Sequence, residues 1–266
     1  MKNLKCKLAQ VFDGLRCLNL LSIAMVLQNP SELRRFISYS LKRYEELTGK
    51  GLPCASPPAP PEDVTVTIPG FHSGGGMSFG ELVILGRVTK SLKPKTIFEM
   101  GTYNGLTTAV FLLNSNPTAR VITLDLPENS VASEAELRGD LELITSRNVA
   151  LVPSILKLRP HTQLLCDSMD FDPTPYLNSV DLGLIDAAHD AAHVENDTLK
   201  MSRMLSNDGI VFWHDYGGKG VLRPLAYYLE TLARSFPIFR IRDTSLAWAR
   251  AERLKEALGR RTASLH

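Results

Sequence analysis

The stretch TIFEMGTYNGLTTAV, residues 96–110, joins a short apolar run to a helix-like run through a turn that contains Gly101 and Gly105. The residues before the turn predict a buried strand, and those after it predict a helix. Glycine lets the backbone pass close to a ligand, and the free amides at a helix start can bind one. The turn lacks the Gly-x-Gly-x-x-Gly spacing of a dinucleotide cradle, and Glu99 beside it disfavours a phosphate. We therefore expect a strand–turn–helix unit whose ligand carries cationic or hydroxyl groups.

Outward from this unit, short apolar strands alternate with helices. Strands are predicted at residues 96–101, 120–126, 162–168, 180–188 and 209–216, and a closing hairpin at 238–243 with 245–251. Helices are predicted at 78–92, 105–115, 131–148, 193–208 and 220–236. Such alternation implies a mostly parallel sheet with helices on both faces. The expected fold class is α/β, a Rossmann-like doubly wound sheet with a C-terminal antiparallel hairpin.

The N-terminal part of the chain has a different character. Residues 1–49 read as two helices, a helical extension, because apolar residues recur at helical spacing in PSELRRFISYSLKRYEELTG. Residues 50–63 are a proline-rich linker, and the main domain is expected at 64–266. The helices would pack on the main domain or on a second subunit, as in a homodimer, or rest as a basic amphipathic helix on a membrane surface.

Composition narrows the class of function. The 266 residues are 44% hydrophobic and 22% charged, as in a soluble globular chain, and Lys and Arg exceed Asp and Glu only by 30 − 28 = 2. No strong field favours nucleic acid, so a small-molecule substrate is expected. The apolar run at 17–27 is too short to be a transmembrane segment. The four cysteines form no Cys-x-x-Cys pair, which favours a reduced, cytoplasmic setting.

Polar residues gather where the predicted strands end. In doubly wound sheets, ligands bind beyond the carboxyl ends of the strands, near the switch in strand order. Asp125 at such an end can accept hydrogen bonds from both hydroxyls of a ribose, although a turn residue before Pro127 would look the same. The strand ends carry Glu99, Gly101, Asp125, Asp167, Ser168, Asp186, His214 and Asp215.

Glu99, Gly101 and Gly105 form the pattern Glu-x-Gly-x-x-x-Gly, and Asp125 and then CDS follow at the next two strand ends. Together they resemble the class I S-adenosylmethionine-dependent methyltransferases, over about residues 75–251. The resemblance implies that the glycine turn approaches the methionine part of the cofactor, that Asp125 binds ribose, and that Asp167 and Ser168 flank adenine. The implied cofactor residues are Glu99, Gly101, Thr102, Tyr103, Asn104, Gly105, Asp125, Asp167, Ser168 and Asp186.

The second half of the chain resembles one branch of that family, the small-molecule O-methyltransferases. That branch has Asp-Gly-x-His after the fourth strand and His-Asp-Tyr after the fifth. This chain keeps Asp186, His189, His214, Asp215 and Tyr216. It departs from the branch at Ala187, where glycine is usual, at Asp208, where a glycine pair is common, and at Ala191, where an aromatic residue is frequent. These departures leave the acceptor open among sugars, phenols and other hydroxylated metabolites.

The chemistry of methyl transfer gives these residues a purpose. A hydroxyl is a poor nucleophile unless a base removes its proton or a metal lowers its pKa. The expected catalytic residues are His189, Asp186 and His214. Asp186 and Asp215 could hold Mg²⁺, with His214 or Tyr216 completing the shell. In a metal-free version, His189 or His214 acts alone as the base.

Two other functions compete with this interpretation. A zinc hydrolase built on His189, His193 and Asp215 would need a glutamate base as in His-Glu-x-x-His, whereas residue 190 is aspartate. A non-catalytic scaffold would bind the cofactor but have a degenerate acceptor site. On its own, His193 reads as a helix-surface or packing residue, and Asp197 as a structural or solvent-facing one.

Overall fold

The computed structural model describes residues 51–57, 63–70, 76–127, 149–217 and 223–263. The two N-terminal helices predicted at 1–49, the helix predicted at 131–148 and residues 58–62 of the linker lie outside this description. All described helices and strands belong to one compact unit, Pro53–His266. The division into an extension, a linker and a domain that starts at residue 64 stays a prediction.

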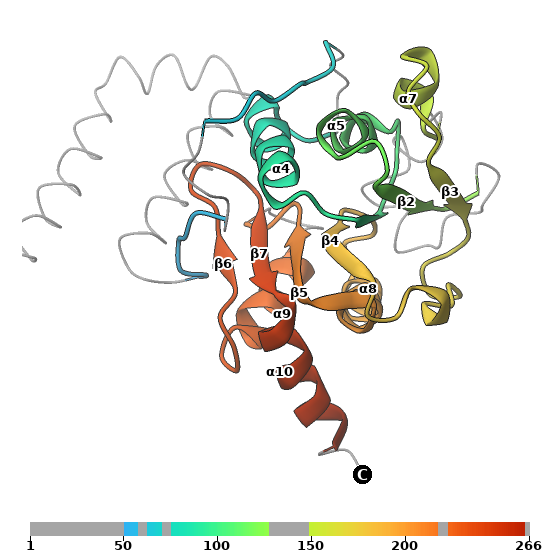
Figure 1. Ribbon diagram of the computed structural model, residues 1–266. Coiled ribbons are helices and arrows are strands. Elements are labelled where there is room, and N and C mark those ends of the chain that lie inside the picture. The colour runs from blue at the N-terminus through green and yellow to red at the C-terminus, as the bar shows by residue number, and fades with distance from the viewer. Residues whose placement is uncertain (1–50, 58–62, 71–75, 128–148, 218–222, 264–266) are drawn as a thin grey trace, which may run out of the picture. The chain divides into compact units, whose positions relative to one another are not determined.

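The unit is built on a seven-stranded sheet in the order β3-β2-β1-β4-β5-β7-β6 (Figure 1). Its strands are β1 (Thr96–Met100), β2 (Arg120–Asp125), β3 (Thr162–Leu165), β4 (Val180–Ile185), β5 (Leu205–Trp213), β6 (Phe239–Arg240) and β7 (Ala247–Arg250). The first five strands pair in parallel, and β7 is antiparallel to both β5 and β6. The predicted doubly wound sheet with a C-terminal antiparallel hairpin is confirmed.

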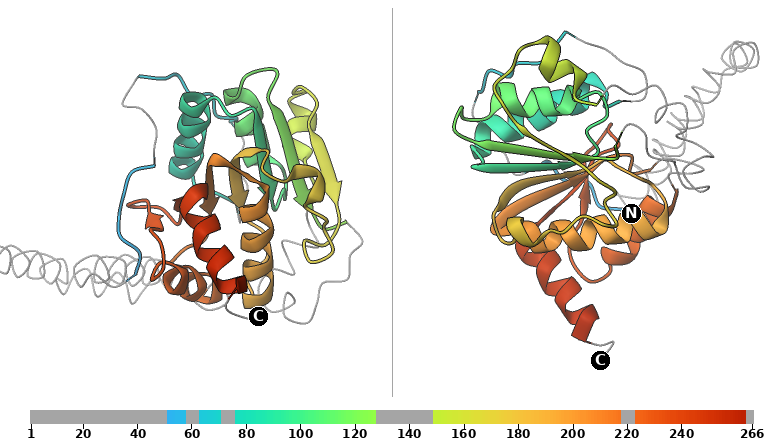
Figure 2. Two further views of the ribbon diagram at one scale, coloured as in Figure 1. Left: turned by 60° about the horizontal axis from the view of Figure 1, so that its bottom comes forward. Right: turned by 90° about the vertical axis from the view of Figure 1, so that its right-hand side faces the viewer.

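Helices cover both faces of this sheet, as Figure 2 shows. On one face lie α4 (Phe79–Leu92), α5 (Leu106–Asn114) and α7 (Leu151–Ile155); on the other lie α8 (Ala191–Met204), α9 (Arg223–Leu232) and α10 (Ala251–Ala263). A 3-10 turn, η2 (Thr174–Tyr176), precedes β4. Among the described helices, none is long and apolar enough to cross a membrane.

The burial of strand β1 explains why its sequence is an almost continuous apolar run. All five of its residues are buried because helices cover both sides, and the run is therefore almost wholly apolar. Glu99 is the exception, with 1% of its surface exposed. A carboxyl group in that position needs hydrogen-bond partners, so its presence in the strand marks a site rather than simple packing.

The boundary between α8 and β5 differs from the prediction. The helix predicted at 193–208 ends at Met204, and residues 205–208 open strand β5 instead. Leu205 pairs with Val180 of β4 at a point where the register shifts, and this pairing outweighs the helical pattern of the local sequence. Helix α10 follows β7 directly and was not predicted.

The strand order places the switch point between β1 and β4. The ladder continues past both strand ends, since Asp186 N donates to Met100 O at 2.8 Å and His214 N donates to Ile185 O at 3.1 Å. The residues that follow β1, β4 and β5 are therefore held side by side at one edge of the sheet. This is the edge at which open α/β sheets bind ligands.

Candidate active site

The turn after β1 needs its first glycine because of β4. Gly101 has a φ of 95°, and a Cβ there would lie 1.9 Å from the carbonyl oxygen of Asp186. Only glycine allows this close approach and this left-handed backbone. The turn that the sequence predicts to bind the cofactor is thus in close contact with the backbone of Asp186, which the sequence predicts to be a catalytic residue.

Gly105 is required for a different reason. A Cβ there would lie 2.7 Å from Cδ of Pro153 and 2.9 Å from Cα of Ala150. The same segment donates two hydrogen bonds to the turn, from Ala150 N to Tyr103 O at 3.1 Å and from Val152 N to Asn104 O at 2.9 Å. Gly105 therefore makes room for residues 150–153, and the space beside it is occupied by protein.

The side chains of the turn are largely engaged in supporting it. The hydroxyl of Thr102, which is 3% exposed, contacts that of Thr123 and accepts from Gln163 Nε2 at 3.0 Å. Asn104 Oδ1 accepts from Leu106 N at 3.1 Å and so satisfies an amide at the start of α5. A ligand at the turn would meet mainly backbone groups.

Asp125 lies next to this turn, as predicted for a ribose ligand. Its Oδ2 accepts from Tyr103 N at 2.6 Å and its Oδ1 accepts from Leu126 N at 2.7 Å. Each carboxylate oxygen can accept further hydrogen bonds, and the residue is half-buried. The two interpretations of Asp125, as a turn residue and as a ribose-binding residue, are thus compatible, because its carboxylate orders the turn and remains accessible.

Glu99 sits beneath the turn with its Oε2 accepting from Thr108 Oγ1 of α5. Burial raises the pKa of Glu99 well above its ordinary value, the Thr108 hydrogen bond offsets part of this, and the charges of Asp186 and Asp125 add to it. Burial therefore favours the protonated form of Glu99, which can donate one hydrogen bond as well as accept others.

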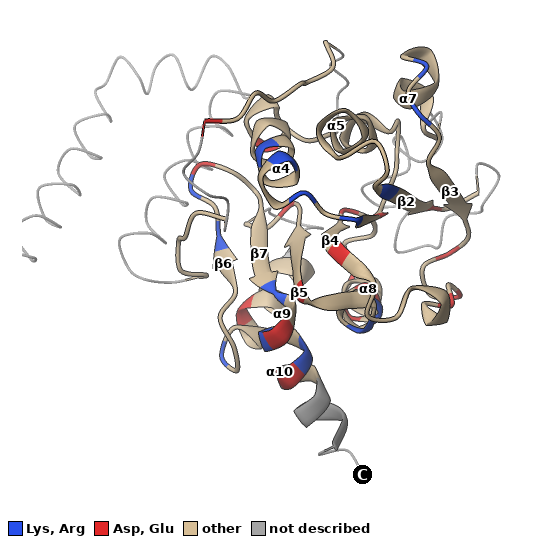
Figure 3. Ribbon diagram, in the orientation of Figure 1, with Lys and Arg blue, Asp and Glu red and all other residues tan. Residues whose placement is uncertain are grey.

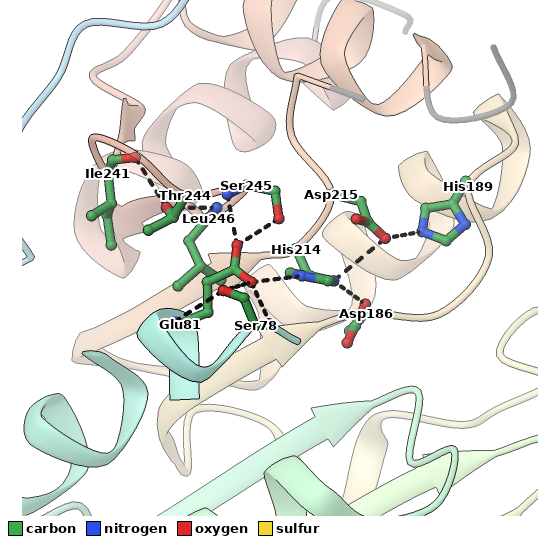
Figure 4. A network of polar contacts seen from close by, with 10 residues as sticks. All are labelled: Ser78, Glu81, Asp186, His189, His214, Asp215, Ile241, Thr244, Ser245 and Leu246. Atoms are coloured by element: carbon green, nitrogen blue, oxygen red, sulfur yellow. Dashed lines mark hydrogen bonds and ion pairs between the residues drawn. The ribbon is translucent and has the colours of Figure 1, made fainter. Parts of the chain in front are cut away.

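The remaining strand ends form a cluster of carboxylates and imidazoles (Figure 4). His189 Nε2 lies 3.1 Å from Asp215 Oδ2, and His214 Nδ1 lies 2.8 Å from Asp186 Oδ1 and 3.4 Å from Asp215 Oδ2. Asp215 has a φ of 62°, a conformation that aspartate tolerates better than most residues. The structure thus brings together the side chains of Asp186, His189, His214 and Asp215, whose roles stay a prediction.

A family model described as a methyltransferase domain matches residues 98–216, which run from β1 to the end of the cluster. Residues 98–216 are a methyltransferase domain. The prediction of a class I S-adenosylmethionine-dependent methyltransferase is confirmed at the level of family and fold. A search of curated protein sequences gave no match.

Solved structures similar to this chain include three that contain a bound cofactor, SAH or SAM. Cofactor-bound Rv0187 from MTB is 18% identical with a TM-score of 0.47, covering 68% of this chain and 83% of that one. The SAH-bound methyltransferase of Podospora anserina is 15% identical with a TM-score of 0.48, covering 65% and 78%. The O-methyltransferase TomG of Streptomyces achromogenes in complex with SAM is 15% identical with a TM-score of 0.45, covering 66% and 81%.

His214 of this methyltransferase is surrounded by acids. Besides Asp186 and Asp215 at Nδ1, its Nε2 faces Glu81 Oε2 at 3.5 Å. Burial alone would lower the pKa of His214, but Asp186, Asp215 and Glu81 raise it far above the ordinary value. The ring is an imidazolium at neutral pH, so it has no lone pair for a metal or for a substrate proton.

Glu81 is the site residue that the sequence did not reveal. It lies in the first turn of α4, where Ser78 and Glu81 cap the helix reciprocally. Its Oε1 also accepts from Ser245 N and Ser245 Oγ, both at 2.7 Å, as Figure 4 shows. Burial would raise the pKa of Glu81, yet the partners His214 and Ser245 hold it far below its usual range. Only the capping box was visible in the sequence, and it gives no hint of His214.

The carboxylates of the cluster differ in character. Burial raises the pKa of Asp186, although the charge and hydrogen bond of His214 offset part of the effect. Burial acts in the same direction on Asp215, but hydrogen bonds from His189 and His214 hold its pKa well below the ordinary value. Asp215 is therefore the firmly ionised member, and it orients His189.

Among the described residues, one group has the donor set of a metal site. One ligand atom each of Asp186, His189 and Asp215 lie within 4.8 Å of one another. Two carboxylates and one imidazole fit a divalent cation. His189 thus takes the place that the sequence gave to His214, whose ring nitrogens both face carboxylates. Tyr216 is turned away, since its hydroxyl donates to Glu230 Oε1 at 3.0 Å.

His193 does not join this group. Its Nδ1 lies 2.6 Å from Asp190 Oδ2 and its Nε2 lies 3.7 Å from Asp167 Oδ1. The zinc pair considered from the spacing of His189 and His193 is therefore not formed. The two histidines face different ends of the methyltransferase site.

Proposed function

We propose that this methyltransferase transfers the methyl group of S-adenosylmethionine to a hydroxyl oxygen of a small metabolite. The observation that carries the proposal is the cluster of Asp186, His189 and Asp215 directly beside the Gly101 turn. In-line methyl transfer needs a base or a cation within reach of the acceptor oxygen and a sulfonium held opposite. A carboxylate-bound imidazole at the carboxyl edge of β4 and β5 meets the first requirement.

The proposed cofactor site lies at the carboxyl ends of β1, β2 and β3. The methionine part would lie at the glycine turn, over Glu99, and the ribose hydroxyls would donate to Asp125. Adenine would lie beside the turn after β3. The proposed set is Glu99, Gly101, Thr102, Tyr103, Asn104, Gly105, Asp125, Asp167, Ser168 and Asp186, with Thr102 and Gly105 contributing backbone only.

His189 is the proposed general base. Its Nε2 is held by the ionised Asp215 at 3.1 Å, and an imidazole held in this way offers Nδ1 to a substrate proton. The acceptor O–H bond breaks toward His189, the oxygen forms a bond to the methyl carbon, and the C–S pair returns to sulfur. The products are the methylated acceptor, S-adenosylhomocysteine and a protonated His189.

His214 and Glu81 have supporting roles in this proposal. The positive charge of His214 offsets the negative charges of Asp186 and Asp215. Both carboxylates could therefore face the acceptor with less mutual repulsion. His214 does not act as the base, because its raised pKa leaves it protonated.

A divalent cation such as Mg²⁺ is proposed as an assisting group. Asp186, His189 and Asp215 would hold it, and when bound it would lower the pKa of the acceptor hydroxyl. In that case Asp186, His189 and Asp215 would orient the acceptor through the ion, and His189 would not have to act as the base. The metal-free version keeps His189 alone.

The test is a product assay with matched variants. Purified protein is incubated with methyl-labelled S-adenosylmethionine and a panel of sugar, phenolic and other hydroxylated acceptors, and labelled product is measured. His189→Gln should lower turnover by about 10²- to 10⁴-fold while the dissociation constant of S-adenosylhomocysteine changes less than about twofold. His161→Gln is the control, because His161 directly precedes the N-terminal end of β3, at the edge of the sheet opposite the proposed site.

Three outcomes would count against the proposal. Absence of any affinity for S-adenosylhomocysteine would remove the cofactor assignment. Full turnover in His189→Gln would remove the base. Binding of the cofactor without product from any acceptor would favour the non-catalytic scaffold.

A further inference from the structure

Helix α8 carries a polar stripe that faces the turn after β3. His193, Asn196, Asp197 and Lys200 follow the spacing i, i+3, i+4 and i+7, so they share one side of the helix. The other partner is the short turn Cys166 to Met169, which follows β3 at the carboxyl edge. The stripe defined by these four residues fastens the turn to the helix.

The main chain of the turn is held by two members of the stripe. Asn196 Nδ2 donates to Ser168 O at 2.9 Å, and Lys200 Nζ donates to Ser168 O at 2.6 Å and to Met169 O at 2.7 Å. Asp197, which is fully buried, accepts a hydrogen bond from Asn196 Nδ2 at 2.9 Å through its Oδ1. These contacts fix the path of the backbone but leave the carboxylate of Asp167 to be placed by something else.

His193 is the member that contacts that carboxylate. Asp190 Oδ1 caps α8 by accepting from Ala192 N and His193 N at 3.0 Å and 3.2 Å. Its other oxygen, Oδ2, lies 2.6 Å from His193 Nδ1. The ring is thereby oriented with Nε2 toward Asp167 Oδ1 at 3.7 Å. A helix cap, an imidazole and a carboxylate form one chain of contacts.

Asp167 has the exposure of a ligand-binding group. Its side chain is 40% exposed, whereas that of His193 is 15% exposed. Its Oδ1 also accepts from Met169 N at 2.8 Å, so this oxygen is held from two sides. The other oxygen, Oδ2, is the one that a ligand would meet. A carboxylate accepts hydrogen bonds only, and on adenine the 6-amino group is the matching donor.

We propose that His193 is a positioning residue that sets Asp167 for recognition of the cofactor's 6-amino group. This inference rests on the proposed placement of adenine beside Asp167 and Ser168. His193 acts through Asp167 and touches neither the acceptor nor the sulfonium. The two histidines of the 189–193 segment thus serve opposite ends of the same cofactor.

The test compares S-adenosylhomocysteine with S-inosylhomocysteine, which carries a 6-oxo group in place of the 6-amino group. The oxo group and the Asp167 carboxylate are both hydrogen-bond acceptors and cannot pair. The native protein should therefore bind the adenosyl ligand more tightly, by about tenfold or more. The ratio of the two dissociation constants, measured by calorimetry, reports adenine recognition alone. A change in overall stability affects both ligands and leaves the ratio unchanged.

Two amide substitutions separate the two sides of the ring. His193→Gln keeps a nitrogen near the Nε2 position and should retain most of the preference. His193→Asn keeps one near Nδ1, toward Asp190, and should reduce the ratio to within about threefold. Asp167→Asn should also lower the ratio, and in the double variant His193→Asn with Asp167→Asn the two losses should not add.

The outcomes are distinct. An unchanged ratio in His193→Asn, or equal behaviour of the Asn and Gln variants, overturns the inference. Additive losses in the double variant overturn it as well, because His193 would then act independently of Asp167. If the native protein binds neither compound, the proposed function itself fails. Melting temperatures of all variants, followed by circular dichroism, confirm that each is folded.

Discussion

Glu81 and His214 meet at 3.5 Å, Oε2 to Nε2, between the first turn of α4 and the end of β5. Both side chains are almost completely buried, at 4% and 7% exposed. The contact links the helix that precedes the sheet with the strand end that carries the acid cluster. It makes the N-terminus of α4 part of the active site, although no residue of α4 needs to touch a substrate.

Replacement of Glu81 by Gln should weaken both the fold and the site. The substitution leaves His214 without one of its compensating charges and weakens the hydrogen bonds from Ser245. We expect the free energy of unfolding to fall by about 2 kcal/mol, measured by urea denaturation. Glu252→Gln, on the exposed side of α10, should change it by less than about 0.5 kcal/mol. Equal effects of the two substitutions would show that the contact with His214 contributes nothing specific.

The stability of the native protein should depend on pH through His214. Its folded pKa is raised above the ordinary 6.5, so its contribution is fully present below pH 6.5 and is lost as pH rises toward the folded pKa. The free energy of unfolding should therefore decline by up to about 1.4 kcal/mol per pH unit above that point. Denaturation curves from pH 7.5 to 9 check this. The decline should be smaller in His214→Gln, and an equal slope would contradict the assignment.

Acid should act through Glu81 and Asp215 in the opposite sense. Their folded pKa values lie below the ordinary ones, so their stabilising contribution is present above about pH 4.5 and is lost as pH falls further. Glu81→Gln should remove part of this acid sensitivity. Denaturation curves from pH 5 to 3 measure it, and unchanged sensitivity in the variant would argue against a depressed pKa for Glu81.

Gly101→Ala should weaken cofactor binding. The added Cβ would fall 1.9 Å from the carbonyl oxygen of Asp186, and the φ of 95° is unfavourable for alanine. The turn must shift away from β4, so affinity for S-adenosylhomocysteine should drop by at least about tenfold. Gly70→Ala is the matched control, since nothing lies within 4 Å of its added Cβ. Native affinity in Gly101→Ala would show that the contact can relax without loss.

Metal dependence can be measured without knowing the acceptor. Mn²⁺ binding followed by electron paramagnetic resonance should show one site per chain, competed by Mg²⁺ and lost in Asp215→Asn. The physical reason is the loss of one of the two carboxylate oxygens in the donor group of Asp186, His189 and Asp215. Binding that survives in Asp215→Asn would place the ion elsewhere, and no binding at all would favour the metal-free base.

The sequence was sufficient for the sheet and for most of the row of acids along its edge. Buried parallel strands are nearly pure apolar runs, so the polar residue that ends each run, such as Asp125 or Asp186, stands out. Residues 205–208 were misread because strand pairing with β4 outweighed a local helical pattern. The fold could thus be predicted where local and tertiary preferences agree.

The contacts within the site could not be predicted in the same way. Glu81 and His214 are brought together only by the packing of α4 on the sheet, and nothing local in either segment encodes it. Gly105 is ambiguous in the same way, because a ligand and residues 150–153 would both require the missing side chain. The stripe on α8 was different, since its spacing was visible in HVENDTLK and only its partner was unknown.

The hydrogen bonds from Ala150 and Val152 to the carbonyls of Tyr103 and Asn104 have a consequence for protein engineering. Any exchange of the chain between β2 and β3 with that of a relative has to preserve these two hydrogen bonds. Residues 149–153, however, are a structural part of the cofactor turn. A chimaera should therefore have its second junction before residue 149, so that the turn after β1 keeps its native neighbours.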